Sequence, residues 1–132
     1  MIVAVTGGRD YANQARVDEG LDTVHGMTPI TLLIHGAASG ADTLAADWAE
    51  RHGIPVKAFP ARWDDLDAKP CRIRLNTFRK PYNALAGFTR NLQMLREGEP
   101  DLLVVFPGGS GTDHCHANAL NMGIPSLEIH DE

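Results

Sequence analysis

Three glycine-rich segments contain the residues of this 132-residue chain that could do chemistry. They read TGGRDY at 6–11, HGAASGAD at 35–42 and FPGGSGTD at 106–113, and each follows an apolar, β-branched run. Glycine lets a charged group approach the bare backbone and tolerates left-handed torsions. Where such a loop leads into a helix, the unpaired N–H groups and the positive dipole end favour an anion. The three segments therefore predict a site for an anion such as phosphate.

Polar residues next to these glycines could complete the site. Arginine binds phosphate through two hydrogen bonds, an asparagine amide can contact a ribose or a base edge, and Ser, Thr or Asp can cap a helix or contact a ligand. The ligand-binding residues that we expect are Gly7, Gly8, Arg9, Gly36, Ser39, Gly40, Asp42, Arg90, Asn91, Pro107, Gly108, Gly109, Ser110, Gly111 and Thr112.

Simpler interpretations remain open for these residues. Any one loop could use glycine only for the geometry of a strand-to-helix turn. Arg9 and Asp10 could form a local ion pair, with Asp10 capping the next helix, and Arg90 could be an ordinary surface residue. Among the aromatic residues, Trp63, Phe78 or Tyr82 could stack on a base or could anchor the long segment in which they lie.

Standard motifs are missing from the three segments. The chain has no G-x-x-x-x-G-K-[ST], no G-x-G-x-x-G after the first apolar run and no G-x-S-x-G around Ser110, which disfavours P-loop NTPases, ordinary NAD-dependent dehydrogenases and serine hydrolases. His114 and His116 are two apart and would point away from each other on a helix, so we expect no metal site.

Alternating strands and helices position the three segments. Apolar runs predict strands at 1–6, 30–35, 55–60, 101–106 and 125–129, and helical spacing predicts helices over 15–26, 41–53, about 89–98 and 113–123. This order predicts a single α/β domain over 1–132, a Rossmann-like three-layer sandwich with a doubly wound, mainly parallel sheet of about five strands. The three loops then lie together at its carboxyl edge, where ligands bind. Residues 61–87 show no clear period and predict a long basic and aromatic insertion loop, either a functional lid or a flexible segment.

Charge and composition restrict the classes of function. The segment 62–90 contains seven Lys or Arg and three Asp, a net +4, so the remainder of this −5 chain carries −9. This distribution argues against a general nucleic-acid binder and fits either a local site for a small anion or a solvated basic loop. The chain has no apolar run that could span a membrane, no signal-peptide pattern and no cysteine motif, so we expect a cytoplasmic protein with free thiols.

The motif PGGSGT at 107–112 resembles the P-G-G-x-G-T motif of the LOG proteins, often labelled lysine decarboxylases, which release ribose 5'-phosphate from nucleoside monophosphates. The chain is still more similar to the YspA-core branch of the SLOG superfamily, with ordered matches at 7–11, 35–42, 89–95 and 101–112. This resemblance implies a Rossmann-like fold and, at the loops, a nucleotide-type ligand such as a derivative of NAD or ADP-ribose. It implies no required cofactor, and by analogy a homodimer or larger oligomer paired through helices.

One position departs from the LOG pattern. Active LOG enzymes continue P-G-G-x-G-T-x-x-E, and the position of that glutamate is occupied here by Cys115. A thiol cannot stabilise an oxocarbenium ion or activate water as a carboxylate does. The resemblance suggests Arg90 as the counterpart of the LOG catalytic arginine, and Asp10 and Asp42 are the remaining candidates for a general base.

Three functions follow from these observations. The first is binding of a nucleotide or an ADP-ribose-like molecule, as a sensor or a sequestering protein. The second is N-glycoside hydrolysis of a nucleotide, with Arg90, Asp42 and Asp10 as the catalytic candidates. The third is a protein-interaction module in which the loops are only turns.

Overall fold

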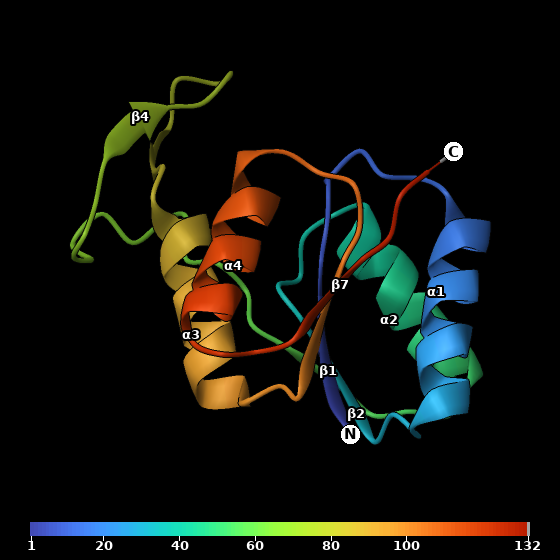
Figure 1. The fold of residues 1–132 in the computed structure, drawn as a ribbon. Coiled ribbons are helices and arrows are strands. Elements are labelled where there is room, and N and C mark those ends of the chain that lie inside the picture. The colour runs from blue at the N-terminus through green and yellow to red at the C-terminus, as the bar shows by residue number, and fades with distance from the viewer. Residues whose placement is uncertain (132) are drawn as a thin grey trace.

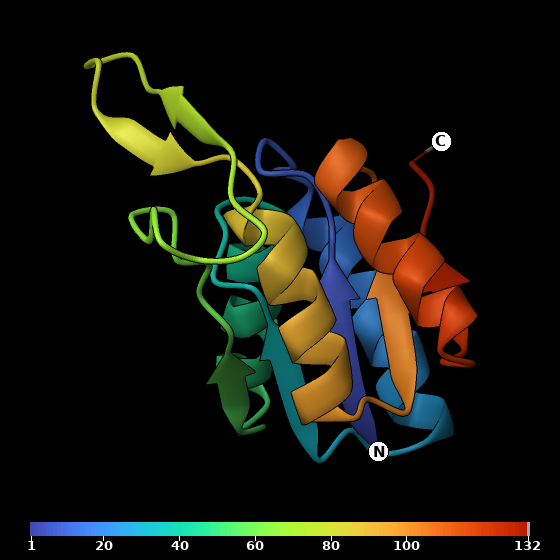
Figure 2. The same ribbon diagram turned by 90° about the vertical axis from the view of Figure 1, so that its left-hand side faces the viewer.

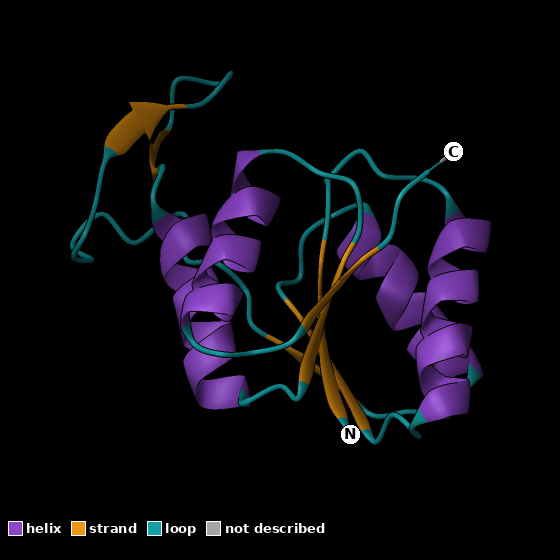
Figure 3. Cartoon of the chain, in the orientation of Figure 1, coloured by secondary structure: helices purple, strands orange, loops and turns teal. Residues whose placement is uncertain are grey.

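A sheet of five parallel strands lies between two layers of two helices each (Figures 1 and 3). The computed structural model describes residues 1–131. Strands run in the order β3-β2-β1-β6-β7, and every neighbouring pair is parallel. Helices α1 and α2 cover one face and α3 and α4 the other, so the predicted doubly wound sandwich is confirmed. The elements are β1 (Ile2–Thr6), α1 (Gln14–Met27), β2 (Leu32–His35), α2 (Ala41–Arg51), β3 (Val56–Ala58), β4 (Ile73–Leu75), β5 (Pro81–Asn83), α3 (Ala86–Gly98), β6 (Leu102–Val105), α4 (Ser110–Asn121) and β7 (Ser126–Glu128).

The central strand β1 is buried on both faces. Successive side chains of a strand point to opposite faces of the sheet. Val3 and Val5 accordingly pack in the cluster under α1 and α2, whereas Ala4 packs in the cluster under α3 and α4. All three are at most 1% exposed. An uninterrupted apolar run is therefore what a central strand of this parallel sheet requires.

Two helices begin earlier than the sequence pattern predicts. Helix α4 starts at Ser110, not at Asp113, so Ser110, Gly111 and Thr112 form its first turn and not a loop. Helix α3 starts at Ala86, not near Thr89. Helix α4 begins with Ser110 and Gly111 and α3 with Ala86 and Gly87, small residues that show no apolar spacing to reveal a helix.

The insertion predicted as a loop without periodicity contains a short hairpin. Strands β4 and β5 pair antiparallel and project from the body of the molecule beyond the carboxyl edge of the sheet (Figure 2). The Asn76 side chain closes the turn by accepting hydrogen bonds from the backbone N–H groups of Phe78, at 2.8 Å, and Lys80, at 3.0 Å. Strands of three residues are too short to show an alternating pattern, which is why the sequence reading missed them.

The three glycine-rich loops are bonded to one another. The Gly8 N–H donates to the Pro107 carbonyl at 2.8 Å, and the Gly8 carbonyl accepts from the Ala41 N–H at 3.1 Å. Gly40 has a φ of +72°, and a Cβ there would collide with the Gly8 carbonyl. A Cβ at Gly108 would lie 2.7 Å from the Gly8 nitrogen. These two glycines are required by backbone packing between loops.

Within the described residues, no helix combines the length and the apolar character needed to cross a membrane.

The loop contacts predict that substituting glycine by alanine changes the free energy of unfolding by different amounts at different positions. Gly40→Ala and Gly108→Ala force a strained backbone or a clash, so each should lower the free energy of unfolding by about 1–3 kcal/mol. Gly26→Ala is the control, because its Cβ would meet nothing within 4 Å and alanine favours a helix interior by about 0.5–1 kcal/mol. Urea unfolding of the three variants measures this, and equal stability of Gly40→Ala and wild type would show that the loops do not pack as described.

Cys115 lies in the apolar core under α3 and α4 and is fully buried. Burial raises the pKa of its thiol to about 11, and the thiolate is the reactive form. We expect only Cys71, which is partly exposed, to react with Ellman's reagent in the native protein, and both thiols in denaturant. In a Cys71→Ser variant the native reaction should disappear; rapid labelling of that variant would contradict the buried position of Cys115.

Candidate ligand-binding site

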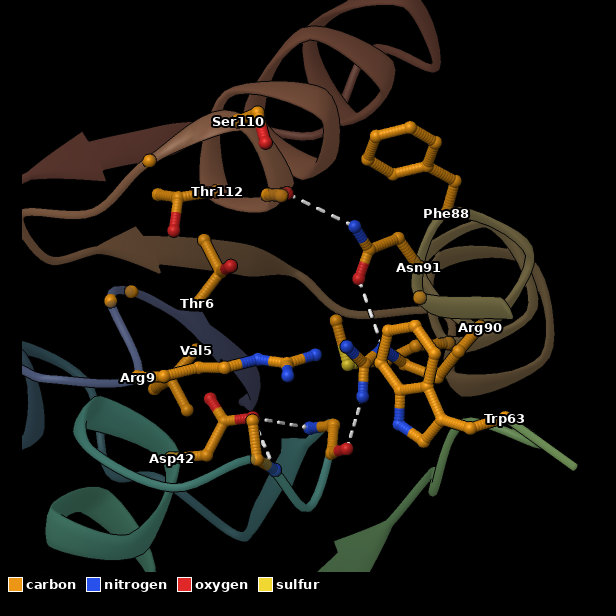
Figure 4. A pocket seen from close by; sticks show the side chains of 18 of the residues that line it. Val5, Thr6, Arg9, Asp42, Trp63, Phe88, Arg90, Asn91, Ser110 and Thr112 are labelled. Atoms are coloured by element: carbon orange, nitrogen blue, oxygen red, sulfur yellow. Dashed lines mark hydrogen bonds between the residues drawn. The ribbon is translucent and has the colours of Figure 1, made fainter. Parts of the chain in front are cut away.

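A cavity of about 360 Å³ opens at the carboxyl edge of the sheet, between the glycine-rich loops and α3 (Figure 4). This volume lies within the range of small-molecule sites, about 300–1,000 Å³. Its wall includes the carboxyl end of β1, the first turn of α4 and one side of α3. The lining residues are Val5, Thr6, Gly7, Gly8, Arg9, Gly36, Ala38, Asp42, Trp63, Ala84, Gly87, Phe88, Arg90, Asn91, Met94, Gly109, Ser110, Gly111 and Thr112.

The N-terminus of α4 faces this cavity without a side-chain cap. Its N-cap residue is Gly109, and no described side chain accepts a hydrogen bond at this cap. A Cβ at Gly109 or Gly111 would meet nothing within 4 Å, so the backbone there is open. By contrast, Asn13 caps α1 by accepting from the Arg16 N–H at 3.1 Å. Helix α2 also has no side-chain cap, but its N-cap residue Gly40 is enclosed by the Gly8 carbonyl and does not line the cavity. Of the helices that follow the three loops, α4 therefore has the N-terminus best placed to receive an anion.

Arg90 is held at the cavity wall by two acceptors. Its Nε donates to Oδ1 of Asn91 at 3.0 Å, and its Nη1 donates to the Gly36 carbonyl (Figure 4). Burial lowers the pKa of Arg90, the nearby Arg9 acts in the same direction and Asp42 opposes them. The guanidinium nevertheless stays protonated, because arginine does not lose its proton in proteins. The cavity therefore contains a fixed positive charge.

Asn91 links α3 to the first turn of α4. It is 5% exposed, and its Nδ2 donates to the Gly111 carbonyl at 3.1 Å while its Oδ1 accepts from Arg90. Both ends of the amide thus have protein partners. The arrangement makes Asn91 a residue that orients Arg90 and α4.

Two aromatic side chains, Trp63 and Phe88, line the cavity. The Arg9 guanidinium carbon sits 4.8 Å from the centre of the Trp63 ring, a cation–π contact that orients the arginine beside the cavity. The Phe88 ring stacks on His114 with centroids 4.3 Å apart. With Arg9 on one face of Trp63 and His114 on one face of Phe88, the other face of each ring could stack on a planar group.

Asp42 is the carboxylate of the cavity wall. Its Oδ2 accepts hydrogen bonds from the backbone N–H groups of Gly36 at 3.0 Å and Ala38 at 3.2 Å, whereas Oδ1 has no hydrogen bond within the described chain. Burial raises the pKa of Asp42, and those N–H groups and the charges of His35 and Arg90 oppose the rise. A buried carboxylate with one oxygen available can accept a hydroxyl proton or a hydrogen bond.

Most of the residues predicted from sequence come together at this cavity, and five do not line it. Asp10 is exposed outside the wall, and the Ser39 hydroxyl donates to the Arg9 carbonyl at 3.1 Å. Gly40, Pro107 and Gly108 serve the contacts between loops described above. Asp10 therefore does not belong to the wall of the candidate site.

Sequence reasoning missed Phe88 and misjudged Phe78. Phe88 stands three residues before Asn91, on the same face of α3, a spacing that could have indicated it. Phe78 is 83% exposed on the hairpin, away from the cavity. Among the described residues, no group of three or more His, Cys, Asp or Glu could hold a metal ion.

Comparisons with known proteins identify a family and a relative that this chain resembles. A model of the YspA, cpYpsA-related SLOG family matches residues 1–65. The Gene 61 protein of Mycobacterium phage D29 is 30% identical over 138 residues, covering 98% of this chain and 97% of that protein.

A solved structure agrees on the fold. The X-ray structure of TM1055 superposes with a TM-score of 0.65 at 19% identity, over 95% of this chain and 71% of its own, and shows that the fold is Rossmann-like. DNA processing protein A of Streptococcus pneumoniae gives 0.49 at 17% identity, over 95% of this chain and 57% of its own, too low to indicate a function. The family model covers the first two glycine-rich loops, and the similarity to the phage protein extends over the third. The chain belongs to the YspA, cpYpsA-related SLOG family.

Proposed function

We propose that the protein binds a nucleotide, or a small molecule derived from NAD or ADP-ribose, in this cavity and acts as a sensor or a sequestering protein. The observation that carries the proposal is the uncapped N-terminus of α4, which opens into a cavity that also contains Arg9 and Arg90. Family membership supports a nucleotide-related role.

The phosphate would lie on the first turn of α4. The bare backbone at Gly109 and Gly111 leaves room for oxygen atoms close to the N–H groups, and the helix dipole favours negative charge there. Arg9 and Arg90 would neutralise the phosphate from the opposite side. Charged hydrogen bonds in a partly buried cavity are stronger than at an open surface.

The remaining parts of the ligand have partners on the same wall. Trp63 and Phe88 offer rings on which a base can stack. The available Oδ1 of Asp42 can accept a hydrogen bond from a ribose hydroxyl. A phosphate, a sugar hydroxyl and a planar base together describe a nucleotide.

A thermal-shift screen tests the proposal with AMP, ADP-ribose, NAD, cyclic nucleotides and ribose 5-phosphate, and with adenosine as the ligand without phosphate. A ligand at 100 times its Kd should add about 2.7 kcal/mol of stability, which is several degrees in Tm for a domain of this size. Adenosine should give a much smaller shift, because it lacks the group that α4 would bind.

The variant Gly109→Ala tests whether the ligand-induced rise in Tm comes from binding at the N-terminus of α4. The added methyl meets open space in the protein, so the variant should fold normally but lose most of the ligand-induced shift. Gly26→Ala is the matched control, because it also adds a methyl into open space, in α1 and outside the cavity wall. An unchanged shift in Gly109→Ala would reject the site, and no shift with any ligand would favour the protein-interaction module.

A second function, N-glycoside hydrolysis, is favoured by one observation: Asp42 combines a raised pKa with an oxygen available at the cavity wall. Here Asp42 would act as general base in place of the glutamate that Cys115 replaces, with Arg90 holding the phosphate. Chromatography of the ligand after incubation should then show released base, and Asp42→Asn should slow the release about 10²–10⁴-fold. Intact ligand would leave binding as the function, whereas equal rates of release in both proteins would show that Asp42 is not the general base.

A further inference from the structure

The hairpin is positively charged, whereas the rest of the chain is negatively charged. We call residues 69–82 the arm; they include five basic residues and no acidic residue. Because the whole chain carries −5, the other residues together carry −10. The arm projects away from the body of the molecule, which separates the two charges in space (Figure 2). Its basic residues are Lys69, Arg72, Arg74, Arg79 and Lys80.

The basic side chains of the arm are exposed, and none of the five forms an ion pair with a described residue. Arginines of the body are different. The Arg51 guanidinium, for example, lies 2.7 Å from a carboxylate oxygen of Asp18 and 3.3 Å from one of Asp47. A cluster of cations without carboxylate partners can neutralise the phosphates of a polyanion, and the counterions released from the polyanion favour its binding.

The arm is fixed to the body at its base. Asn83 is 1% exposed, and its backbone N–H donates to the Trp63 carbonyl at 2.6 Å. Its Oδ1 accepts from the backbone N–H groups of Leu85, at 3.0 Å, and Arg72, at 3.2 Å. An isolated hairpin of two strands is only marginally stable in water, so these bonds, with the Asn76 turn at the tip, hold the arm in one shape. The basic side chains therefore extend from an ordered frame and not from a structureless loop.

The arm places flat rings beside its cations. Arg72 and Arg74 are two residues apart and therefore lie on one face of β4, where Tyr82 is the cross-strand partner of Arg74. In the turn, Phe78 is 83% exposed and directly precedes Arg79. Aromatic rings and guanidinium groups both stack on nucleobases, whatever the sequence of the bases. A single strand of nucleic acid offers phosphates for the cations and unpaired bases for such a ring.

We propose that the arm binds single-stranded nucleic acid, with phosphates on its basic face and a base stacked on Phe78. A duplex fits less well, because its bases are stacked on one another and present no free face to Phe78. The −10 of the remaining chain repels nucleic acid from the body, which confines the contact to the arm. This site is separate from the cavity and does not depend on the nucleotide proposed there.

Fluorescence anisotropy of labelled oligonucleotides tests the proposal, with single strands of DNA and of RNA of about ten nucleotides and with the DNA duplex. The single strands should bind more tightly than the duplex, and the two single strands show which sugar is preferred. The logarithm of the binding constant should fall with that of the salt concentration, with a slope of about −3.5 if all five cations contact phosphates. Arg74→Gln/Arg79→Gln should reduce this slope by about 1.4. Phe78→Ala should raise the Kd about 5–150-fold and leave the slope unchanged.

Two control variants separate this contact from a general effect of charge or of the hairpin. Lys57→Gln/Arg96→Gln removes the same charge at exposed positions outside the arm and should leave the Kd nearly unchanged. Ile73→Ser/Leu75→Ser alters the other face of β4, where these side chains are 59% and 64% exposed, and should also leave it nearly unchanged.

Equal losses of affinity in the two charge variants, loss of binding in Ile73→Ser/Leu75→Ser, or tighter binding of the duplex would overturn the proposal. Absence of oligonucleotide binding at low salt would also overturn it. If vesicles containing phosphatidylserine are bound and oligonucleotides are not, the arm contacts a membrane surface and the proposal is wrong.

Discussion

The site depends on a single peptide position, Gly8, whose backbone bonds two other loops at once. Its N–H donates to Pro107 and its carbonyl accepts from Ala41, which joins loops that are distant in sequence. Because the loops lie this close to Gly8, there is no space for a Cβ at Gly40 or Gly108. Because the three loops are fixed to one another, the N-terminus of α4 is fixed opposite the helix that carries Arg90. The backbone contact thereby fixes the loops that form one wall of the cavity.

The charges at the cavity support the proposed binding of an anion more than cleavage of a glycosidic bond. A guanidinium is fixed in the wall, and the first turn of α4 adds a positive dipole end. Cys115 occupies the position of the LOG glutamate. It is a neutral thiol buried in the core between the sheet and helices α3 and α4. Among the described residues that line the cavity, Asp42 is the one acidic residue. Two backbone N–H groups donate hydrogen bonds to one of its carboxylate oxygens. With fewer carboxylates near it, a phosphate meets less repulsion.

The sequence predicts this fold well, because local patterns determine the central elements. A run such as Val3 to Val5 can only be a buried strand here, and the order of elements places three loops at one edge. The roles of single glycines are not local. Gly108 and Gly109 are adjacent, yet one is enclosed by Gly8 and the other faces open space, a difference that only the long-range contact decides. The hairpin escaped prediction because each of its strands has only three residues, too few to show an alternating pattern.

Nuclear magnetic resonance of the ¹⁵N-labelled protein, titrated with ADP-ribose or AMP, tests the central claim most directly. If phosphate binds the first turn of α4, the backbone amide signals of Gly109, Ser110 and Gly111 should show the largest shifts and saturate with a single Kd. The side-chain signal of Arg90 should move with them. Shifts confined to residues 69–82, or spread evenly over the surface, would contradict the account, because the ligand would then be bound by exposed charge and not by the helix.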